Sequence, residues 1–243
     1  MKKLLKISII VLFAFLIQIL IGCGEDSKEQ KTATNESVKI KLDDKAKAFG
    51  IKLSDNKDFS NPQDSFIEQR VEISDTTFAN IKYKEAFNAN GKLQDHTFFA
   101  YTLYVKNGGN KASTIEIDVD SGNVTRSCDK AIRISIIEEG NVDDTNNINF
   151  SKGTIFLKND GHGDEILIEK LNEEPEKKAF YDRFAKEFFT NYEHFGNFSI
   201  ENIGVNEIKK VTIIIWFEGW DLDDTNEIIT GQMDLSFVFS VNE

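Results

Sequence analysis

The sequence predicts an all-β sandwich with one inserted helix, and three observations point to this fold class. Short segments in which apolar and polar residues alternate recur through much of the chain. Turn-forming glycine, asparagine and aspartate separate them at intervals of roughly 8–15 residues. One stretch instead repeats aromatic residues every four positions, which is typical of a helix. Short strands interrupted by a single helix indicate a β-sandwich with a helical insertion.

Several segments alternate with period two, so their side chains point to opposite faces of a strand. The clearest alternating sets lie in residues 97–105, 115–120 and 132–136. Residues 106–110 read Lys-Asn-Gly-Gly-Asn and predict a turn, because glycine and asparagine accept a positive φ at little cost. Residues 154–157 and 166–168 predict a hairpin joined by the Gly- and Asp-rich stretch 159–164.

Two strands predicted near the C-terminus differ in how they are buried. Residues 211–217 place apolar side chains on both faces, which predicts a central strand covered on both sides. Residues 233–241 alternate apolar with polar side chains, which predicts a strand with one face in water.

The inserted helix is predicted over about residues 175–193. Pro175 suits a first helical turn, where the missing N–H costs nothing. An apolar stripe then recurs every four residues, at Phe180, Phe184, Phe188 and Tyr192. We interpret this stripe as the face that packs on a sheet. A helix lying on a membrane surface is the alternative, although its polar face has few basic residues.

The N-terminus predicts an exported lipoprotein. A basic start is followed by an apolar run from residue 7 to residue 21, which is short for a membrane span of roughly 20 residues. The run ends in Leu20-Ile21-Gly22-Cys23, which resembles the lipobox of bacterial lipoproteins. That resemblance implies cleavage of residues 1–22 and acylation of Cys23, and hence a cell-membrane location, lipid-anchored on the extracytoplasmic face. A plain signal anchor with an incidental cysteine is the alternative.

The mature chain is predicted to have two parts. Residues 23–37 comprise the acylated cysteine and a polar, aperiodic stretch that predicts a disordered tether. Residues 38–243 form the predicted β-sandwich domain. Cys128 is then the only other cysteine, so an internal disulfide is excluded and burial of this thiol is favoured over pairing between chains.

The charge of the mature chain excludes one class of partner. Three of the 29 basic residues lie in the signal segment, which leaves 26 against 41 acidic residues, a net charge of −15. Such an acidic chain cannot neutralise phosphates, so nucleic-acid binding is excluded. The predicted partners are the membrane, through the lipid anchor, and the chain itself, matrix or another surface protein.

The most unusual motif is the stretch 216–221, and two interpretations of it stay open. As a ligand or interaction site, two tryptophans would form a stacking platform with nearby acids as polar partners. The candidate residues are Trp216, Glu218, Trp220, Asp221, Asp223 and Asp224. As structure, Trp216 would fill the core and Gly219 would allow the strand to end in a turn. The structural interpretation is favoured.

Neither a metal site nor a catalytic site is predicted. The acidic stretches 221–226 and 118–123 resemble calcium loops but lack the Gly at the sixth position and the Glu at the twelfth, so solvated turns are favoured over Ca²⁺ sites. The histidines His96, His162 and His194 have no metal-ligand spacing, although the stretch around His162 could hold a cation at a hairpin tip. No nucleophile or phosphate-binding motif is present, and no cofactor is predicted.

Two longer stretches resemble the TasA/camelysin-like exported surface proteins of Gram-positive bacteria. The first is residues 100–109, Ala-Tyr-Thr-Leu-Tyr-Val-Lys-Asn-Gly-Gly, with residues 131–136 following it. The second is residues 211–221, Val-Thr-Ile-Ile-Ile-Trp-Phe-Glu-Gly-Trp-Asp, with Ile-Ile-Thr-Gly at 228–231. Together they cover about half of the mature chain. The resemblance implies an antiparallel, jelly-roll-like β-sandwich at the cell surface, in a family with members that build matrix fibres.

The chain departs from this family at informative places. Leu222 and Asp224 stand where the family motif has proline and cysteine, and a lipid anchor replaces release from the cell. Some camelysin-like proteins are described as proteases, but no protease motif is found in this chain. The sequence therefore predicts a non-enzymatic surface lipoprotein that contacts matrix, a partner protein or itself. The alternatives are a lipoprotein that binds a glycan or Ca²⁺ and, ranked last, a hydrolase.

Overall fold

A computed structural model describes residues 36–142, 148–159, 164–221 and 231–242. All of these residues belong to one compact unit. The signal peptide, Cys23 and almost all of the tether lie outside the described residues. Among the helices that the structure describes, none is long and apolar enough to cross a membrane.

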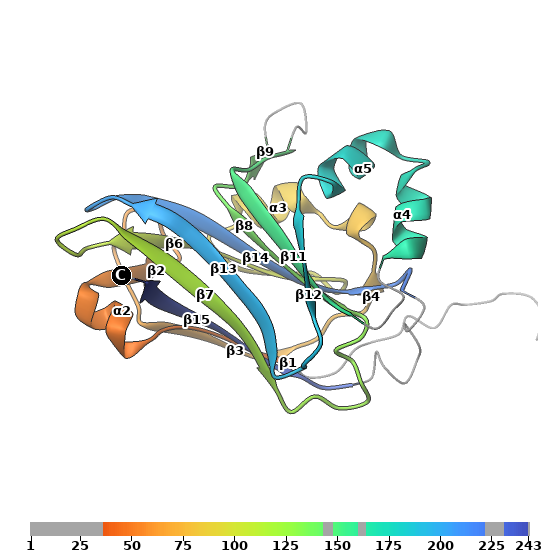
Figure 1. Ribbon diagram of the computed structural model, residues 1–243, viewed down its shortest axis with the longest axis horizontal. Helices are drawn as coiled ribbons and strands as arrows, with labels where there is room; N and C mark the ends of the chain where they lie inside the picture. The colour runs from red at the N-terminus through yellow and green to blue at the C-terminus, as the bar shows by residue number, and fades with distance from the viewer. Residues whose placement is uncertain (1–35, 143–147, 160–163, 222–230, 243) are drawn as a thin grey trace, which may run out of the picture. The chain divides into compact units, whose positions relative to one another are not determined.

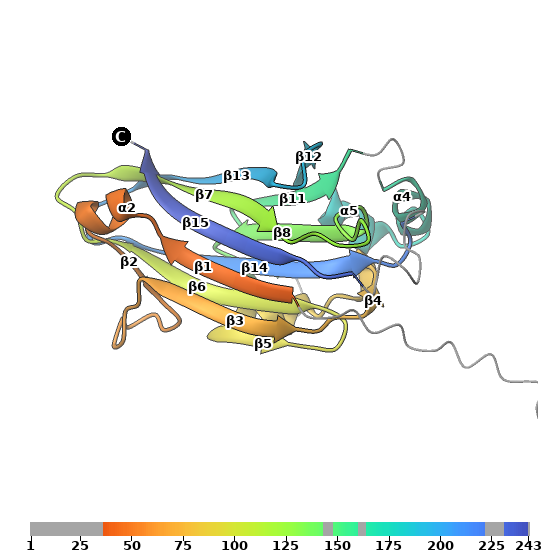
Figure 2. The same cartoon turned by 90° about the horizontal axis from the view of Figure 1, so that it is seen from below.

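Two β-sheets pack face to face in the described part of the chain (Figures 1 and 2). The five-stranded sheet has the order β13 (His194–Ile203), β7 (Ser113–Gly122), β15 (Asp234–Asn242), β1 (Glu36–Leu42) and β3 (Ser65–Val71). The eight-stranded sheet has the order β12 (Ala185–Phe189), β11 (Lys152–Lys158), β8 (Ile132–Glu138), β14 (Ile208–Glu218), β6 (Phe99–Asn107) and β2 (Ile51–Ser54), with β5 (Gly91–Gln94) paired to β6 and β4 (Asp75–Thr76) paired to β14. A small ladder joins β9 (Asn141–Val142) to β10 (Ile148–Asn149). The predicted sandwich is confirmed.

The eight-stranded sheet is covered on both faces, and β14 lies at its centre. Within β14, Ile213 and Ile215 point into the core between the sheets, whereas Ile214 and Trp216 belong to a second core on the opposite face. The predicted central strand is therefore confirmed. The half-exposed strand near the C-terminus is also confirmed, because the residues of β15 alternate between buried and partly exposed.

Short helices cover the second core. They are η1 (Phe78–Asn80), α3 (Tyr83–Asn88), α4 (Glu165–Leu171) and α5 (Pro175–Tyr181). Side chains from these helices pack on the outer face of the eight-stranded sheet, among them Phe78, Phe87, Leu167 and Tyr181. Figure 1 shows helices α3, α4 and α5 beside this sheet. A fourth α-helix, α2 (Asp44–Phe49), begins where the side chain of Asp43 accepts a hydrogen bond from the Ala46 N–H at 2.6 Å. The single predicted helix is thus replaced by four short α-helices among the described residues.

The predicted turn after residue 105 is present, but its glycines are required for close packing rather than for a positive φ. Strand β6 ends at Asn107 and β7 begins at Ser113. A Cβ atom on Gly108 would lie 2.6 Å from the Gly50 carbonyl oxygen, and one on Gly109 would lie 2.5 Å from the Phe49 ring. These glycines are needed because the turn packs closely against the end of α2.

The prediction of a purely antiparallel fold is wrong at three strand pairs. Strand β1 pairs with β15 in parallel, β11 pairs with β12 in parallel, and β4 pairs with β14 in parallel. The remaining strand pairs are antiparallel. Alternation in a sequence locates strands, but it does not specify which distant strand becomes the neighbour.

The predicted helix over 175–193 is confirmed only at its start. Helix α5 ends at Tyr181, and residues 185–189 form β12, which pairs with β11. Phe184 is buried, but Phe188 is 54% exposed and Tyr192 is 46% exposed. The four-residue spacing was therefore coincidental beyond Phe180, because residues 185–189 pair with the edge of β11 and satisfy their backbone groups there.

Two other local predictions are wrong. The second arm of the predicted hairpin, 166–168, belongs to helix α4, where Leu167 and Leu171 are buried one turn apart. Short apolar runs of this kind do not distinguish a strand from a helix. The predicted acidic turn at 118–123 lies almost wholly inside β7, with Asp118 and Asp120 on its partly exposed side.

Candidate functional site

The motif at 216–221 lies where β14 ends, and the structure separates its candidate residues. Trp216 is 1% exposed and belongs to the second core, so it is not part of an exposed stacking platform. Trp220 is partly buried against the same cluster. Glu218 and Asp221 are buried as well. Asp223 and Asp224 lie outside the described residues.

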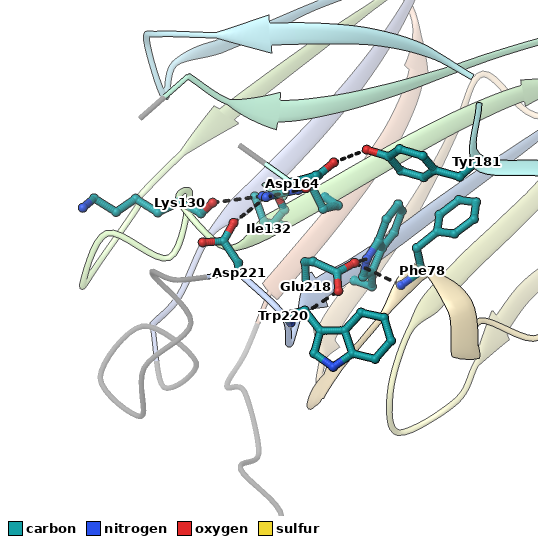
Figure 3. A network of polar contacts seen from close by, with 10 residues as sticks. Phe78, Lys130, Ile132, Asp164, Tyr181, Glu218, Trp220 and Asp221 are labelled. Carbon is teal, nitrogen blue, oxygen red and sulfur yellow. Dashed lines mark hydrogen bonds and ion pairs between the residues drawn. The ribbon is translucent and has the colours of Figure 1, made fainter. Parts of the chain in front are cut away.

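Glu218 is an enclosed carboxylate that organises the end of β14. It is 0% exposed, and its Oε2 atom accepts hydrogen bonds from Trp216 Nε1 and from the Phe78 N–H, both at 3.0 Å. The Trp220 N–H donates to Oε1 at 3.4 Å (Figure 3). Burial raises the pKa of Glu218 to about 7, although these donors act against the shift. Glu218 therefore fixes both tryptophans and cannot touch a ligand.

Asp221 belongs to a second buried cluster, centred on Arg133 of β8. The Arg133 side chain is 1% exposed, and its Nε and Nη2 atoms both donate to Asp164 Oδ1 at 3.0 Å. Nη2 also donates to Asp221 Oδ2 (Figure 3). Nη1 donates to the carbonyl oxygens of Lys130 and Ile132 at 3.0 Å each. The guanidinium is thus surrounded by acceptors.

Electrostatics within this cluster favour the charged form of Arg133. Burial disfavours the charge, but Asp164, Asp221 and Glu218 outweigh that effect, and the pKa of Arg133 rises above its usual value. The Tyr181 hydroxyl donates to Asp164 Oδ2, so this carboxylate is bound on both oxygens. We name Arg133, Asp164, Tyr181 and Asp221 the Arg133 network. It joins β8, the start of α4, the end of α5 and the end of β14.

An open groove of about 580 Å³ lies beside the Arg133 network. Its lining comes from β11, β12, α4 and the segment that leaves α5, and it includes Asp164 and Tyr181. Two apolar residues of the lining are also exposed to solvent: Phe188 is 54% exposed and Ile168 is 40% exposed. We name it the β12 groove. Because the Arg133 network holds α4 and α5 in place, it also fixes the walls of the groove.

Lys186 stabilises the segment between α5 and β12. Its Nζ atom donates to the carbonyl oxygens of Tyr181 and Phe184, both at 2.9 Å, and lies 3.8 Å from the centroid of the Tyr181 ring. Burial lowers the pKa of Lys186 to about 8. These contacts close the end of α5 and orient one wall of the β12 groove.

Sequence reasoning missed the members of this site other than Asp221. Arg133 was assigned to the polar face of an alternating strand, but β8 is buried along its whole length. Asp164 was assigned to an acidic hairpin tip, whereas it immediately precedes α4. One available signal was an arginine within a strongly apolar strand, since a buried charge requires partners.

The metal-binding alternatives find no support among the described residues. No group of three or more His, Cys, Asp or Glu side chains there is placed to hold a metal ion. Asp120 contacts His194 Nδ1 at 2.8 Å. Burial and the neighbouring Glu116 and Asp120 raise the pKa of Asp118. His162 and most of the 221–226 stretch lie outside the described residues.

Cys128 is buried, as predicted, and its Sγ atom lies 3.5 Å from the Gln232 carbonyl oxygen.

Comparisons with known proteins give little guidance. No family model and no curated protein matches the chain. Among solved structures, the chain is similar to that of TmCBM61 in complex with β-1,4-galactotriose, with a TM-score of 0.24 and 11% sequence identity. The match covers 70% of this chain and 74% of that one.

Proposed function

We propose that this chain is an exported lipoprotein, held on the extracytoplasmic face of the membrane by acylated Cys23, whose β-sandwich domain binds a ligand without transforming it. The β12 groove is the observation that carries the binding role. The sequence Leu20-Ile21-Gly22-Cys23 supports the membrane anchor.

The geometry of the β12 groove supports binding. Its volume of about 580 Å³ falls within the usual range for small-molecule sites, roughly 300–1,000 Å³. Its lining combines four apolar side chains and Tyr181 with six polar or charged side chains, so a ligand there would meet both apolar surface and hydrogen-bonding groups. The Arg133 network holds its walls in one arrangement, and a preorganised site loses less entropy when it binds.

The buried acids support binding more than acid–base catalysis. Glu218 and Asp164 each accept hydrogen bonds on both carboxylate oxygens. Glu218 is 0% exposed, so it is outside the reach of a substrate in the groove. A catalytic acid or base must come within hydrogen-bonding distance of the proton it transfers.

The proposed anchor leaves the domain room to stand away from the membrane. The first described residue, Glu36, follows Cys23 by 13 positions in the chain. An extended chain of that length spans at most roughly 45 Å.

A second candidate function is contact with matrix, another surface protein or a second copy, as the TasA-like resemblance implies. The observation that favours it is β3, the terminal strand of the five-stranded sheet, where Ile67 is 56% exposed. Terminal strands offer backbone groups to an added strand. Assembly that rises with protein concentration, and that falls when Ile67 is replaced by lysine, would support this function.

The anchor is tested by growing cells with labelled palmitate. The full chain is expected to carry the label in the membrane fraction, and Cys23→Ala is expected to abolish labelling because no other residue provides the acylated sulfur. Cys128→Ala is the matched control, since it removes the only other cysteine, and it should leave the label unchanged. An unlabelled wild-type chain, or a labelled Cys23→Ala chain, contradicts the proposed anchor.

A further inference from the structure

We propose that the β12 groove binds a neutral saccharide, with the Phe188 ring stacked against the sugar. This inference rests on the proposed binding function and names its ligand class. Three observations carry it: an exposed aromatic ring on the edge strand, a mixed polar lining, and a charge balance that favours an uncharged ligand.

The ring of Phe188 is well placed for stacking. Phe188 belongs to β12, the terminal strand of the eight-stranded sheet, and is 54% exposed although it lines the groove. Alternation along β12 places Lys186 and Phe188 on the groove side, while Phe189 points into the core between the sheets. Ile168, which is 40% exposed, adds apolar surface to the lining. A pyranose offers a face of C–H groups that suits an aromatic surface of this size.

The rest of the lining provides both donors and acceptors. Asn159 contributes an amide, and Glu165 and Asp182 contribute carboxylates. Each sugar hydroxyl is one donor and two acceptors, so it can pair with either kind of group. A purely apolar ligand would leave these polar groups desolvated without partners, which costs binding free energy.

The charges around the groove disfavour an anionic ligand. Glu165 and Asp182 are acidic, and the whole chain carries a net charge of −12. The cations that line the groove already have partners: Lys158 is paired with Asp129, and Lys186 donates to the Tyr181 and Phe184 carbonyl oxygens. Two of the three acids of the lining are likewise paired, Asp164 with Arg133 and Asp182 with Lys178, and the third, Glu165, is exposed to solvent. An uncharged, hydroxyl-rich ligand fits this balance.

The experiment is a calorimetric titration of the full-length protein, purified in detergent, with maltotriose, cellotriose, mannotriose and chitotriose. We expect at least one of the four to saturate the protein. Phe188→Ala is expected to weaken that binding by about tenfold, the effect of losing one aromatic contact. Tyr192→Ala is the matched control, because Tyr192 is 46% exposed and lies outside the groove lining. It should change the affinity less than about twofold.

Two further variants distinguish stacking from general apolar contact. Phe188→Trp keeps an aromatic face and should bind as tightly as the wild type or more tightly. Phe188→Leu keeps apolar bulk without a ring and should weaken binding nearly as much as alanine. Equal binding by the leucine and wild-type proteins overturns the stacking role. Since Phe188 is largely exposed, circular dichroism should show all variants folded.

Two outcomes overturn the saccharide assignment. One is that none of the four trisaccharides saturates the wild-type protein. The other is that decanoate or glucuronate binds more tightly than every neutral sugar and loses affinity on Phe188→Ala, which would make the groove a carboxylate site. Either result leaves the palmitate experiment unaffected, so failure of this inference is distinguishable from failure of the proposed anchor.

Discussion

Replacement of Arg133 by methionine is expected to lower the free energy of unfolding by about 3–5 kcal/mol, because it removes a buried positive charge that pairs with two buried carboxylates. The Arg133 side chain is 1% exposed and forms ion pairs with both Asp164 and Asp221. Methionine has a similar length, so the loss reports the charge more than the packing. Denaturant unfolding monitored by circular dichroism measures the change.

Two comparisons make the Arg133 prediction specific. Arg183→Met removes an exposed arginine that donates to the Ile148 and Phe150 carbonyl oxygens, and it should cost less than about 1 kcal/mol. Adding Asp164→Asn and Asp221→Asn to Arg133→Met should recover part of the lost stability, because amides are cheaper to bury than charges. A loss below about 1 kcal/mol in Arg133→Met alone would contradict the structural role assigned to the network.

The stability of the protein is expected to fall by roughly 3 kcal/mol between about pH 4.5 and pH 7 through Glu218 alone. Its pKa is raised from 4.5 to about 7 in the folded protein, so the folded state binds the proton more tightly than the unfolded state. The contribution is therefore fully present below pH 4.5 and is lost as the pH rises through 7. Unfolding free energies measured at steps across this range give the slope.

Glu218→Gln isolates this contribution, because glutamine has no charge to lose. The difference in slope between wild type and Glu218→Gln should appear below pH 7 and vanish above it. Every other titratable group is present in both proteins, so its contribution cancels in the difference. Parallel curves for the two proteins would show that Glu218 is ionised at ordinary cost in the folded state.

The Arg133 network and the β12 groove are structurally coupled. Asp164 and Tyr181 belong to both, since each contacts the network and lines the groove. A buried network with all its members paired holds one arrangement, and this arrangement gives the groove its shape. Glu218 holds Trp216 and Trp220 in one arrangement through its hydrogen bonds. The motif at 216–221 therefore supports the site without lining the groove.

Much of the fold could be predicted from the sequence because the pleat of a strand is a local property. The alternation at 97–105, 115–120 and 233–241 located β6, β7 and β15, and the apolar run at 211–217 located a central strand. Burial of Cys128 and Trp216 could also be predicted, because side chains of these types are usually buried in folded proteins. The helix at 175–193 was predicted over too long a range because four-residue spacing also arises by chance in aromatic-rich sequence.

By itself, the sequence determined the β class, the position of the longest strands of the core, the acidic charge and the lipobox-like cysteine. Only the tertiary structure decided which strands pair in parallel, where α5 gives way to β12, and which carboxylates meet Arg133. The partners Asp164 and Asp221 lie 31 and 88 positions from Arg133 in the chain. The physical reason is that side-chain periodicity is set by neighbouring residues, whereas the pairing of a buried charge and the shape of a groove depend on contacts between distant segments.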